Sequence, residues 1–231
     1  MNIAENIRIV RENIARAAIA CGRDPAEILL VGASKMNDAD TVRAAIAAGL
    51  GICGENRVQE MLEKNALGAY EGAELHFIGH LQKNKVKNVV GLAKLIHSVD
   101  SLELVELIDR RAEKLGIIQD ILLEVNIAGE ASKSGFSPSE ISAAIDKSSA
   151  FSSVRVRGLM TVAPICQNSE EIRPIFSLMR KLFIDNGQKK YDNSNMDFLS
   201  MGMSGDYETA IACGANMIRL GSAIFGPRHY T

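Results

Sequence analysis

Two patterns of hydrophobic and polar positions alternate along this chain. Residues 3–20 carry apolar side chains at helical spacing with charged side chains between them, which predicts an amphipathic helix. Residues 28–35 instead form a continuous apolar run of strand length that ends at Lys35. An unbroken run of this kind is typical of a strand buried on both faces, as in a parallel sheet.

The same order of strand and helix repeats to the end of the chain. We predict further strands at residues 51–54, 75–78, 95–99, 120–127, 154–160, 196–199 and 216–220. Helices are expected between them, at residues 37–48, from about 55 past 62, around 83–87, at 101–115, from 137, at 169–183 and at 206–212. Eight strands that alternate with helices predict an α/β fold, a single parallel (β/α)8 TIM-type barrel over residues 1–231.

An open, doubly wound sheet is the alternative fold for this pattern. Such a sheet usually carries a glycine fingerprint after its first strand, where this chain has Lys35, Met36 and Asn37. The barrel is therefore favoured. Its eighth helix is almost missing from the pattern, and the N-terminal helix could cover that side instead.

Composition and charge narrow the class of protein. The 26 Lys and Arg residues against 28 Asp and Glu give a net charge of -2, so nothing attracts nucleic acid or an anionic membrane in general. Cys21, Cys53, Cys166 and Cys213 lie far apart and form no CxxC pair, as expected of reduced thiols in an intracellular protein. With no run of membrane-spanning length and no signal peptide pattern, we expect a cytoplasmic protein.

Lys35 is the first candidate for chemistry. Side chains alternate along a strand, so Val31, Ala33 and Lys35 are expected on one face, at the end of the strand where parallel α/β proteins gather their active sites. An amine in an apolar setting loses its charge more readily than one in water, and a neutral amine is a nucleophile. Lys35 could thus form a Schiff base with an aldehyde cofactor, or it could be an ordinary solvated lysine.

Two small turns near the end of the chain are candidates for a phosphate site. Residues 202–206 and 220–223 follow the seventh and eighth strands, carry glycines, and include the hydroxyls of Ser204 and Ser222. Barrels often bind phosphate with these two loops, although Gly and Ser are also common in ordinary turns. Arg219, among apolar strand residues, needs a partner. It could form an ion pair, or donate to a phosphate or to a ring nitrogen, which a permanent cation would keep unprotonated.

Other polar residues carry weaker signals. Asn56, after the second strand, could donate to a ring hydroxyl or could cap a helix. His76 and His80 lie four residues apart without a carboxylate or cysteine at ligand spacing, so a metal site is not favoured. Lys133, in the loop after the fifth strand, could approach the same end of the barrel.

Long stretches of the chain resemble, in order, the YggS/PROSC family of pyridoxal 5'-phosphate (PLP) homeostasis proteins. The resemblance covers nearly the whole chain and is carried by residues 31–35, 54–60, 76–85, 98–100, 158–160, 199–204 and 219–226. It implies a barrel like the N-terminal domain of alanine racemase, the type III fold of PLP proteins. It also implies the cofactor PLP, bound as a Schiff base on Lys35.

The resemblance further implies which residues bind the cofactor. Arg219 would lie by the pyridine nitrogen, Asn56 near the ring and Met201 along the pocket, while the remaining residues would hold the phosphate. The full implied set is Lys35, Asn56, Met201, Ser204, Arg219, Gly221 and Ser222. Arg57 departs from the pattern expected of many relatives and would alter only the rim of the site.

Two functional classes remain open. The resemblance implies a vitamin B6 protein that binds, buffers or delivers PLP, with PLP-dependent apoenzymes as acceptors and without established turnover. The alternative is a PLP-dependent amino-acid racemase, which needs a base on each face of the substrate carbon. In alanine racemase the second base is a tyrosine from another domain, and no tyrosine here lies in a segment matched to that role. We therefore expect a binding protein, monomeric, with neither nucleic acid nor membrane as its partner.

Overall fold

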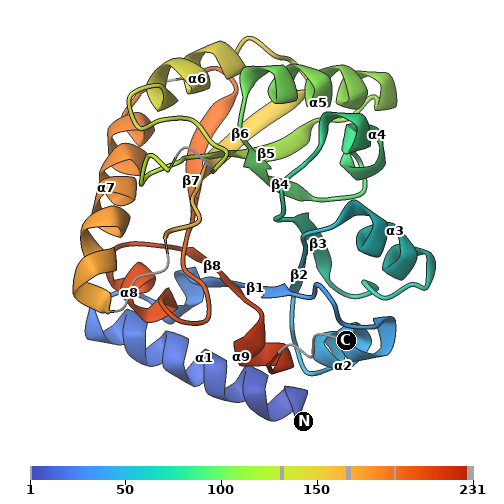
Figure 1. The fold of residues 1–231 in the computed structure, drawn as a ribbon, viewed down its shortest axis with the longest axis vertical. Helices are drawn as coiled ribbons and strands as arrows, with labels where there is room; N and C mark the ends of the chain where they lie inside the picture. Colours follow the sequence, from blue (N-terminus) through green and yellow to red (C-terminus); the bar gives the residue numbers. More distant parts are fainter. Residues whose placement is uncertain (1, 131–132, 165–167, 190, 228–231) are drawn as a thin grey trace.

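The strands of this protein close into a parallel barrel, which the computed structural model describes over residues 2–130, 133–164, 168–189 and 191–227 (Figure 1). Neighbouring strands follow chain order, and β8 pairs with β1 to close the barrel. This arrangement confirms the predicted barrel and excludes the open sheet. The strands are β1 (Leu29–Ala33), β2 (Ile52–Glu55), β3 (Glu74–Phe77), β4 (Leu95–Val99), β5 (Gln119–Glu124), β6 (Val154–Met160), β7 (Ser194–Ser200) and β8 (Met217–Leu220).

Helices surround the barrel on its outer side (Figure 1). The α-helices are α1 (Ile3–Ala20), α2 (Ala39–Ala47), α3 (Val58–Ala66), α4 (Val86–Val89), α5 (Leu102–Leu115), α6 (Ile141–Ser148), α7 (Ser169–Gly187), α8 (Tyr207–Ala212) and α9 (Ser222–Phe225), and η1 (Pro25–Glu27) and η2 (Lys83–Lys85) are 3-10 turns. Asp38 and Ser101 cap α2 and α5 as their positions predict, and Gly116 ends α5 in the left-handed conformation. No helix in the described part of the chain is long and apolar enough to cross a membrane.

The N-terminal helix covers the side of the barrel that lacks a full eighth helix. Helix α9 has only four residues, and α1 packs across both α8 and α9 (Figure 1). The apolar face of α1, with Ile7, Val10 and Ile14, is buried there. The Asn6 side-chain amide donates to the carbonyl oxygen of Ile224 at 2.8 Å. The structure thus confirms the covering role suggested for this helix.

Alternation along the strands sorts the apolar side chains into two clusters. The inner cluster fills the barrel and contains Val31, Ile78, Leu95, Leu122, Met160 and Met217. The outer cluster lies between the strands and the helices, and it includes Cys53, Phe77 and Leu123. Because the barrel interior is a packed core, polar side chains that point into it need partners there.

Two predicted helix starts were wrong, and a third predicted helix is shorter than expected. Helix α3 begins at Val58 rather than near residue 55, because Glu55 still belongs to β2. Helix α6 begins at Ile141 rather than at 137, since Ser137 and Glu140 first close a turn in which the Ser137 amide donates to the Glu140 carboxylate at 2.9 Å. The lysine-rich segment forms a 3-10 turn followed by only one turn of α-helix.

Candidate functional site

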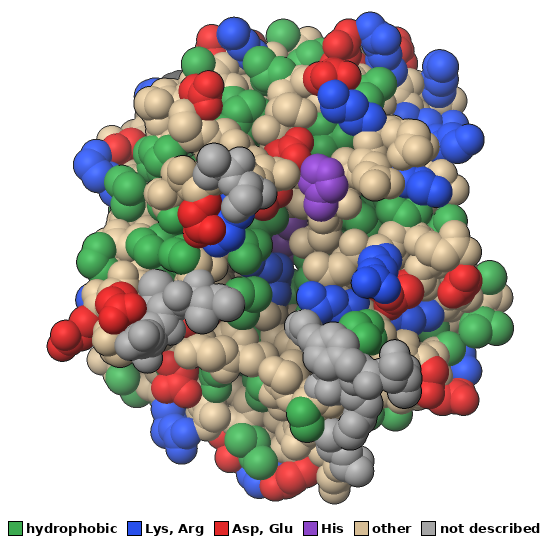
Figure 2. Space-filling model, viewed as in Figure 1, with side chains coloured by type: hydrophobic (Ala, Val, Ile, Leu, Met, Phe, Trp, Pro, Cys, Tyr) green, Lys and Arg blue, Asp and Glu red, His purple; other side chains and the backbone are tan. Residues whose placement is uncertain are grey.

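Lys35 lies where β1 ends, at the mouth of the barrel, by which we mean the opening at the carboxyl ends of the strands. Leu29, Val31 and Ala33 all pack with the inner cluster, as the expected alternation requires. The same alternation assigns the half-buried Lys35 to the inner face. Figure 2 shows the mouth of the barrel, which is hollowed at its centre and has Lys or Arg and His side chains along the wall of the hollow.

The residue before Lys35 is fixed from outside the barrel by a buried carboxylate and a buried lysine. The Ser34 hydroxyl and the Lys64 ammonium both donate to Glu55 Oε1 at 2.7 Å, and Tyr70 donates to it at 3.0 Å. Lys64 also donates to the Ser34 carbonyl oxygen at 2.8 Å. Ser34 and Glu55 are fully buried, so these bonds are shielded from water.

Helix α3, which carries Lys64, also holds the residue after Lys35 through Glu60. Met36 adopts a left-handed backbone with φ of 62°, which costs energy in a non-glycine residue. Its amide donates to the Glu60 carboxylate at 2.7 Å, and the Asn37 side chain donates to the Lys35 carbonyl oxygen at 3.0 Å. Glu60 lies 3.5 Å from the Lys64 ammonium. Helix α3 therefore anchors the backbone on both sides of Lys35.

Asn56 follows β2, next to the strand that carries Lys35. It does not cap α3, because Arg57 takes the N-cap position. Its side-chain oxygen is buried and has no hydrogen-bond partner within the described structure. The backbone of Asn56 lies against Gly79, where a Cβ would approach the Asn56 carbonyl oxygen to 2.1 Å. The loop after β3 thus fixes the position of Asn56 and requires glycine to do so.

Arg219 points into the barrel from β8. It pairs with Val31 across the β1–β8 ladder and alternates with Met217, and both of those residues belong to the inner cluster. Its guanidinium donates to the Ser200 hydroxyl at 2.6 Å and to the Thr161 carbonyl oxygen at 2.9 Å. The residue is only 5% exposed, so this cation is held inside the barrel.

Two carboxyl groups lie within electrostatic reach of this cation. Burial lowers the pKa of Arg219 to about 10, and the charges of Glu124 and Asp206 oppose that shift, so the guanidinium stays charged at neutral pH. Burial and the nearby Asp100 charge raise the pKa of Glu124 to about 7, against the opposing effect of Arg219. Sequence reasoning missed Glu124; its signal is a carboxyl at an inner position, two residues after Leu122.

Two buried imidazoles occupy the inner faces of β3 and β4. His76 is 2% exposed and His97 is fully buried, and their facing ring nitrogens lie 3.0 Å apart. His80, by contrast, is exposed at the mouth, 3.5 Å from the Asp100 carboxylate. The sequence pairing of His76 with His80 overlooked His97, whose signal is a polar residue in the middle of an apolar strand, two positions from Leu95.

The two candidate phosphate loops meet beside β1. The Ser204 hydroxyl accepts a hydrogen bond from the Ala223 amide at 3.3 Å, so the loops after β7 and β8 touch. A Cβ on Gly221 would lie 3.6 Å from the Ala33 carbonyl oxygen, two residues before Lys35. Ser222 is exposed at the start of α9. The two loops therefore lie beside the end of β1, at the same side of the mouth.

Two other residues named from the sequence lie elsewhere. Met201 is fully buried in the outer cluster rather than in the cluster that fills the barrel, so its pocket role stays a prediction. Lys133 is half-buried, and its ammonium pairs with the Glu130 carboxylate at 2.7 Å. Asn126 organises that loop by donating to the carbonyl oxygens of Glu130 and Lys133.

Comparison with known proteins places this geometry in context. The alanine racemase N-terminal domain family matches residues 2–229. A protein from Aquifex aeolicus is 42% identical and a protein from Pseudomonas aeruginosa is 40% identical, and both are named pyridoxal phosphate homeostasis protein. The first match spans 100% of both chains, and the second spans 99% of this chain and 96% of the relative.

Solved structures agree with the fold. An unknown protein from Bifidobacterium adolescentis is 36% identical, with a TM-score of 0.88 over 96% of this chain and 94% of its own. PipY of Synechococcus elongatus, solved with PLP bound, is 34% identical with a TM-score of 0.84, over 97% of this chain and 100% of its own. An alanine racemase from Clostridium difficile is 16% identical with a TM-score of 0.67, over 99% of this chain and 57% of its own, which shows a shared fold alone.

Proposed function

The chain belongs to the family of pyridoxal phosphate homeostasis proteins, built on the alanine racemase N-terminal domain, and from this membership we propose that it binds PLP. The proposed attachment is a Schiff base on Lys35. The proposed role is to store, buffer or deliver PLP without catalytic turnover. Its acceptors would be PLP-dependent apoenzymes, and it would work as a monomer in the cytoplasm.

The observation that carries this proposal is the buried Asn56 oxygen, which lacks a hydrogen-bond partner in the described structure. A buried polar atom without a partner is costly, and a bound polar ligand relieves that cost. Lys35 and Asn56 follow the ends of β1 and β2, and Arg219 lies on β8. These three strands are adjacent in the barrel. A pyridine ring with a neighbouring hydroxyl and an aldehyde would meet an amide, an amine and a guanidinium there.

Each of these residues suits one part of PLP, which supplies an aldehyde carbon open to attack and a ring that can take up electrons. Lys35 would supply the amine, and Asn56 would bind the ring hydroxyl. Arg219 can only donate, so it would hold the ring nitrogen as an acceptor without protonating it. Because an unprotonated ring is a weak electron sink, this environment suits a carrier better than a carbanion enzyme.

The phosphate would occupy the two loops that meet beside β1. Ser204 and Ser222 offer hydroxyl groups, and Gly221 leaves room for a close approach to the backbone. Backbone amides at the start of a helix favour an anion. The proposed binding set is therefore Lys35, Asn56, Ser204, Arg219, Gly221 and Ser222, with Met201 as a less direct member.

The racemase alternative lacks support from the described tyrosines. Tyr70 lies outside the barrel and donates to Glu55, and Tyr191 donates to Asn186. Tyr207 begins α8 and packs in the outer cluster. Tyr230 lies outside the described residues. Since racemisation needs a second base at the substrate carbon, we favour the carrier role.

The test is a titration of the apo-protein with PLP, comparing wild type with Asn56→Ala. Since the Asn56 oxygen has no partner to lose, the apo-variant should unfold at the same denaturant concentration as wild type or a higher one. Its apparent Kd for PLP should rise on the order of tenfold, the value of one lost hydrogen bond. Equal affinity in the variant would remove Asn56 from the site.

A second assay separates carrier from enzyme. The PLP-loaded protein is mixed with an apoenzyme whose activity reports PLP transfer, and separately with L-alanine while optical rotation is followed. The carrier role predicts recovery of the acceptor's activity and no racemisation above the rate of free PLP. Sustained racemisation at enzyme-like rates would overturn the carrier role.

A further inference from the structure

A continuous chain of side-chain hydrogen bonds crosses the inside of the barrel and ends at Arg219. The Arg219 guanidinium contacts the Ser200 hydroxyl at 2.6 Å, and that hydroxyl lies 3.1 Å from His97 Nδ1. His97 Nε2 lies 3.0 Å from His76 Nδ1. His76 Nε2 reaches the Glu74 carboxylate at the longer distance of 3.4 Å.

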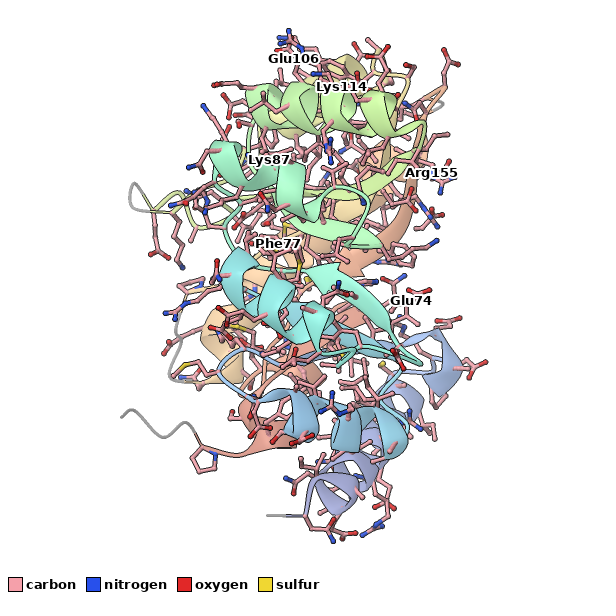
Figure 3. All side chains as sticks on the ribbon, turned by 90° about the vertical axis from the view of Figure 1, so that its right-hand side faces the viewer. Glu74, Phe77, Lys87, Glu106, Lys114 and Arg155 are labelled. Atoms are coloured by element: carbon pink, nitrogen blue, oxygen red, sulfur yellow. The ribbon has the colours of Figure 1, made fainter. Side chains whose placement is uncertain are left out.

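This chain of hydrogen bonds leads from the mouth toward the opposite end of the barrel. Glu74 is the first residue of β3, and Figure 3 shows it at one end of that strand with Phe77 at the other. The Glu74 side chain is 56% exposed, whereas His76, His97 and Ser200 are at most 2% exposed. The hydrogen bonds run from β3 through His97 of β4 and Ser200 of β7 to Arg219 of β8, so they cross the interior of the barrel and β5 and β6 contribute no side chain to them.

The Glu74 carboxylate fixes which way the histidine protons point, and Arg219 is compatible with that order. Arg219 can only donate, so Ser200 accepts from it and its own proton is free to go to His97 Nδ1. His97 then carries its proton on Nε2 and donates to His76 Nδ1. His76 in turn carries its proton on Nε2 and donates to Glu74, which as a carboxylate can only accept.

The opposite assignment fails at the far end. If His97 carried its proton on Nδ1, its bare Nε2 would accept from His76, and the bare Nε2 of His76 would face the Glu74 carboxylate. Two acceptors would then oppose each other. With both rings neutral, only one set of tautomers satisfies every contact. The Glu74 carboxylate selects it, and Arg219 is compatible with it because the Ser200 hydroxyl can accept from the guanidinium while it donates to His97.

We propose that His97 and His76 are positioning residues that hold the Arg219 guanidinium through Ser200 and thereby orient the group that binds at Arg219. This inference rests on the proposed PLP site. Burial supports the neutral state, since it lowers the pKa of His76 to about 4 and that of His97 well below its usual value. Lys94 and Arg219 are the nearby cations that add to these shifts, and Glu74 opposes the shift of His76.

Simple filling of the core does not account for these residues. The inner cluster around them is made of Leu, Ile, Val and Met side chains, which fill a barrel without any polar atom. A buried imidazole costs free energy unless both of its nitrogens are bonded. Both nitrogens of His76 and of His97 have partners here, and the partners form a single line to Arg219.

The first test reads the tautomers directly in the apo-protein. Histidine labelled with 15N is incorporated, and the ring nitrogens are assigned by NMR at pH 7 with His97→Gln as the assignment aid. Neutral rings protonated on Nε2 at both His76 and His97 are expected. An imidazolium, or a proton on Nδ1 of either ring, would overturn the proposal without bearing on whether PLP binds.

The second test compares two substitutions of His97. Gln can accept from Ser200 and donate to His76, whereas Leu can do neither. In a PLP titration, His97→Leu should raise the apparent Kd on the order of tenfold and shift the visible absorbance band, and His97→Gln should stay within about threefold of wild type. Leu95→Ala, a cavity in the inner cluster beside His76, is the control for a purely structural loss.

The outcomes separate the two proposals. If His97→Leu and Leu95→Ala lower stability alike but only His97→Leu changes PLP affinity and the spectrum, the positioning role stands. If both variants keep wild-type affinity and spectrum, the positioning role fails while the PLP site survives. If wild type takes up no PLP, the proposed function fails. The NMR result then decides alone whether the hydrogen bonds from Glu74 to Arg219 run in the proposed direction.

Discussion

At the level of single residues, the site depends on two charged side chains that lie outside the barrel, between its strands and helices. Lys64 neutralises Glu55, and both are buried outside the barrel while Lys35 faces its mouth. The bonds from Lys64 and Glu55 to Ser34 fix the peptide that leads into Lys35. Such a pair contributes order to the site even where its net effect on folding is small.

Removing one partner of this pair should be costly. Lys64→Met leaves the Glu55 carboxylate buried without its cation, and the free energy of unfolding of the apo-protein should fall by about 3 kcal/mol or more. Urea denaturation measures the change. Lys83→Met, which breaks the exposed pair with Glu103, is the matched control and should cost less than about 1 kcal/mol. Equal effects of the two substitutions would contradict the account of Lys64.

Glu124 should make stability depend on pH in a definite direction. Its pKa is raised to about 7 in the folded protein, so its contribution is fully present below the ordinary carboxyl pKa and is lost as pH rises through 7. Glu124→Gln, which stays neutral, should therefore gain stability relative to wild type by roughly 3 kcal/mol between pH 4 and pH 8.

The measurement is urea unfolding of the apo-proteins across that range. His76 has the opposite dependence, because its lowered pKa removes stability as pH falls below about 6.5, and comparison of variant with wild type cancels that contribution. Glu106→Gln on the surface of α5 is the control and should show a small, flat difference. A flat difference for Glu124→Gln as well would show that this carboxyl is ionised at neutral pH.

The sequence predicted residues whose signals are local and missed those defined by distant partners. Lys35 stands out at the end of an apolar run, and Arg219 stands out inside one. Glu55 and His97 do not stand out, because their hydrogen-bond partners, Lys64 and Ser200, lie on other elements of the fold. A polar residue at an inner strand position is the signal that would have identified His97.

At the scale of elements, one close approach between two loops sets the position of Asn56. Gly79 lies in the loop after β3 and packs on the backbone of Asn56, with no room for a Cβ. The glycine therefore acts on the site through the loop after β2, without a side chain of its own. Its neighbour in sequence, His80, lines a cavity of about 290 Å³ together with Asn56.

Gly79→Ala should displace Asn56 and weaken PLP binding. The Cβ would overlap backbone atoms, which cannot move aside as a flexible side chain can, so a loss of about 1–3 kcal/mol in stability is expected. The apparent Kd for PLP should rise on the order of tenfold, as for Asn56→Ala. Gly51→Ala is the control, since nothing lies within 4 Å of its Cβ position. Unchanged PLP affinity in Gly79→Ala would refute this role.

Strands and long helices were predicted better than the turns that precede helices. Strands β4 and β6 match their predicted bounds, and α5 begins after Ser101 and ends at Gly116 as its caps require. The starts of α3 and α6 were misplaced, because their first residues bond to strand or turn partners before the helix begins. Hydrophobic periodicity does not report such contacts.

At the scale of the whole molecule, the barrel brings the two ends of the chain to one site. Strands β1 and β8 are far apart in sequence but pair directly, so Lys35 and Arg219 rise from neighbouring strands. The count and order of strands predicted this closure. The polar chain from Glu74 to Arg219 follows from closure too, yet it could not be predicted, because inward-facing residues of non-adjacent strands meet only inside a formed barrel.

Whether Lys35 carries PLP as a Schiff base is tested by reducing the PLP-treated protein with borohydride and mapping its peptides by mass, for wild type and Lys35→Ala. We expect a visible absorbance band in wild type that disappears on reduction, with the pyridoxyl phosphate mass fixed on Lys35, and neither signal in the variant. Label on another lysine in wild type, or the absence of uptake when PLP is supplied in excess, would contradict it.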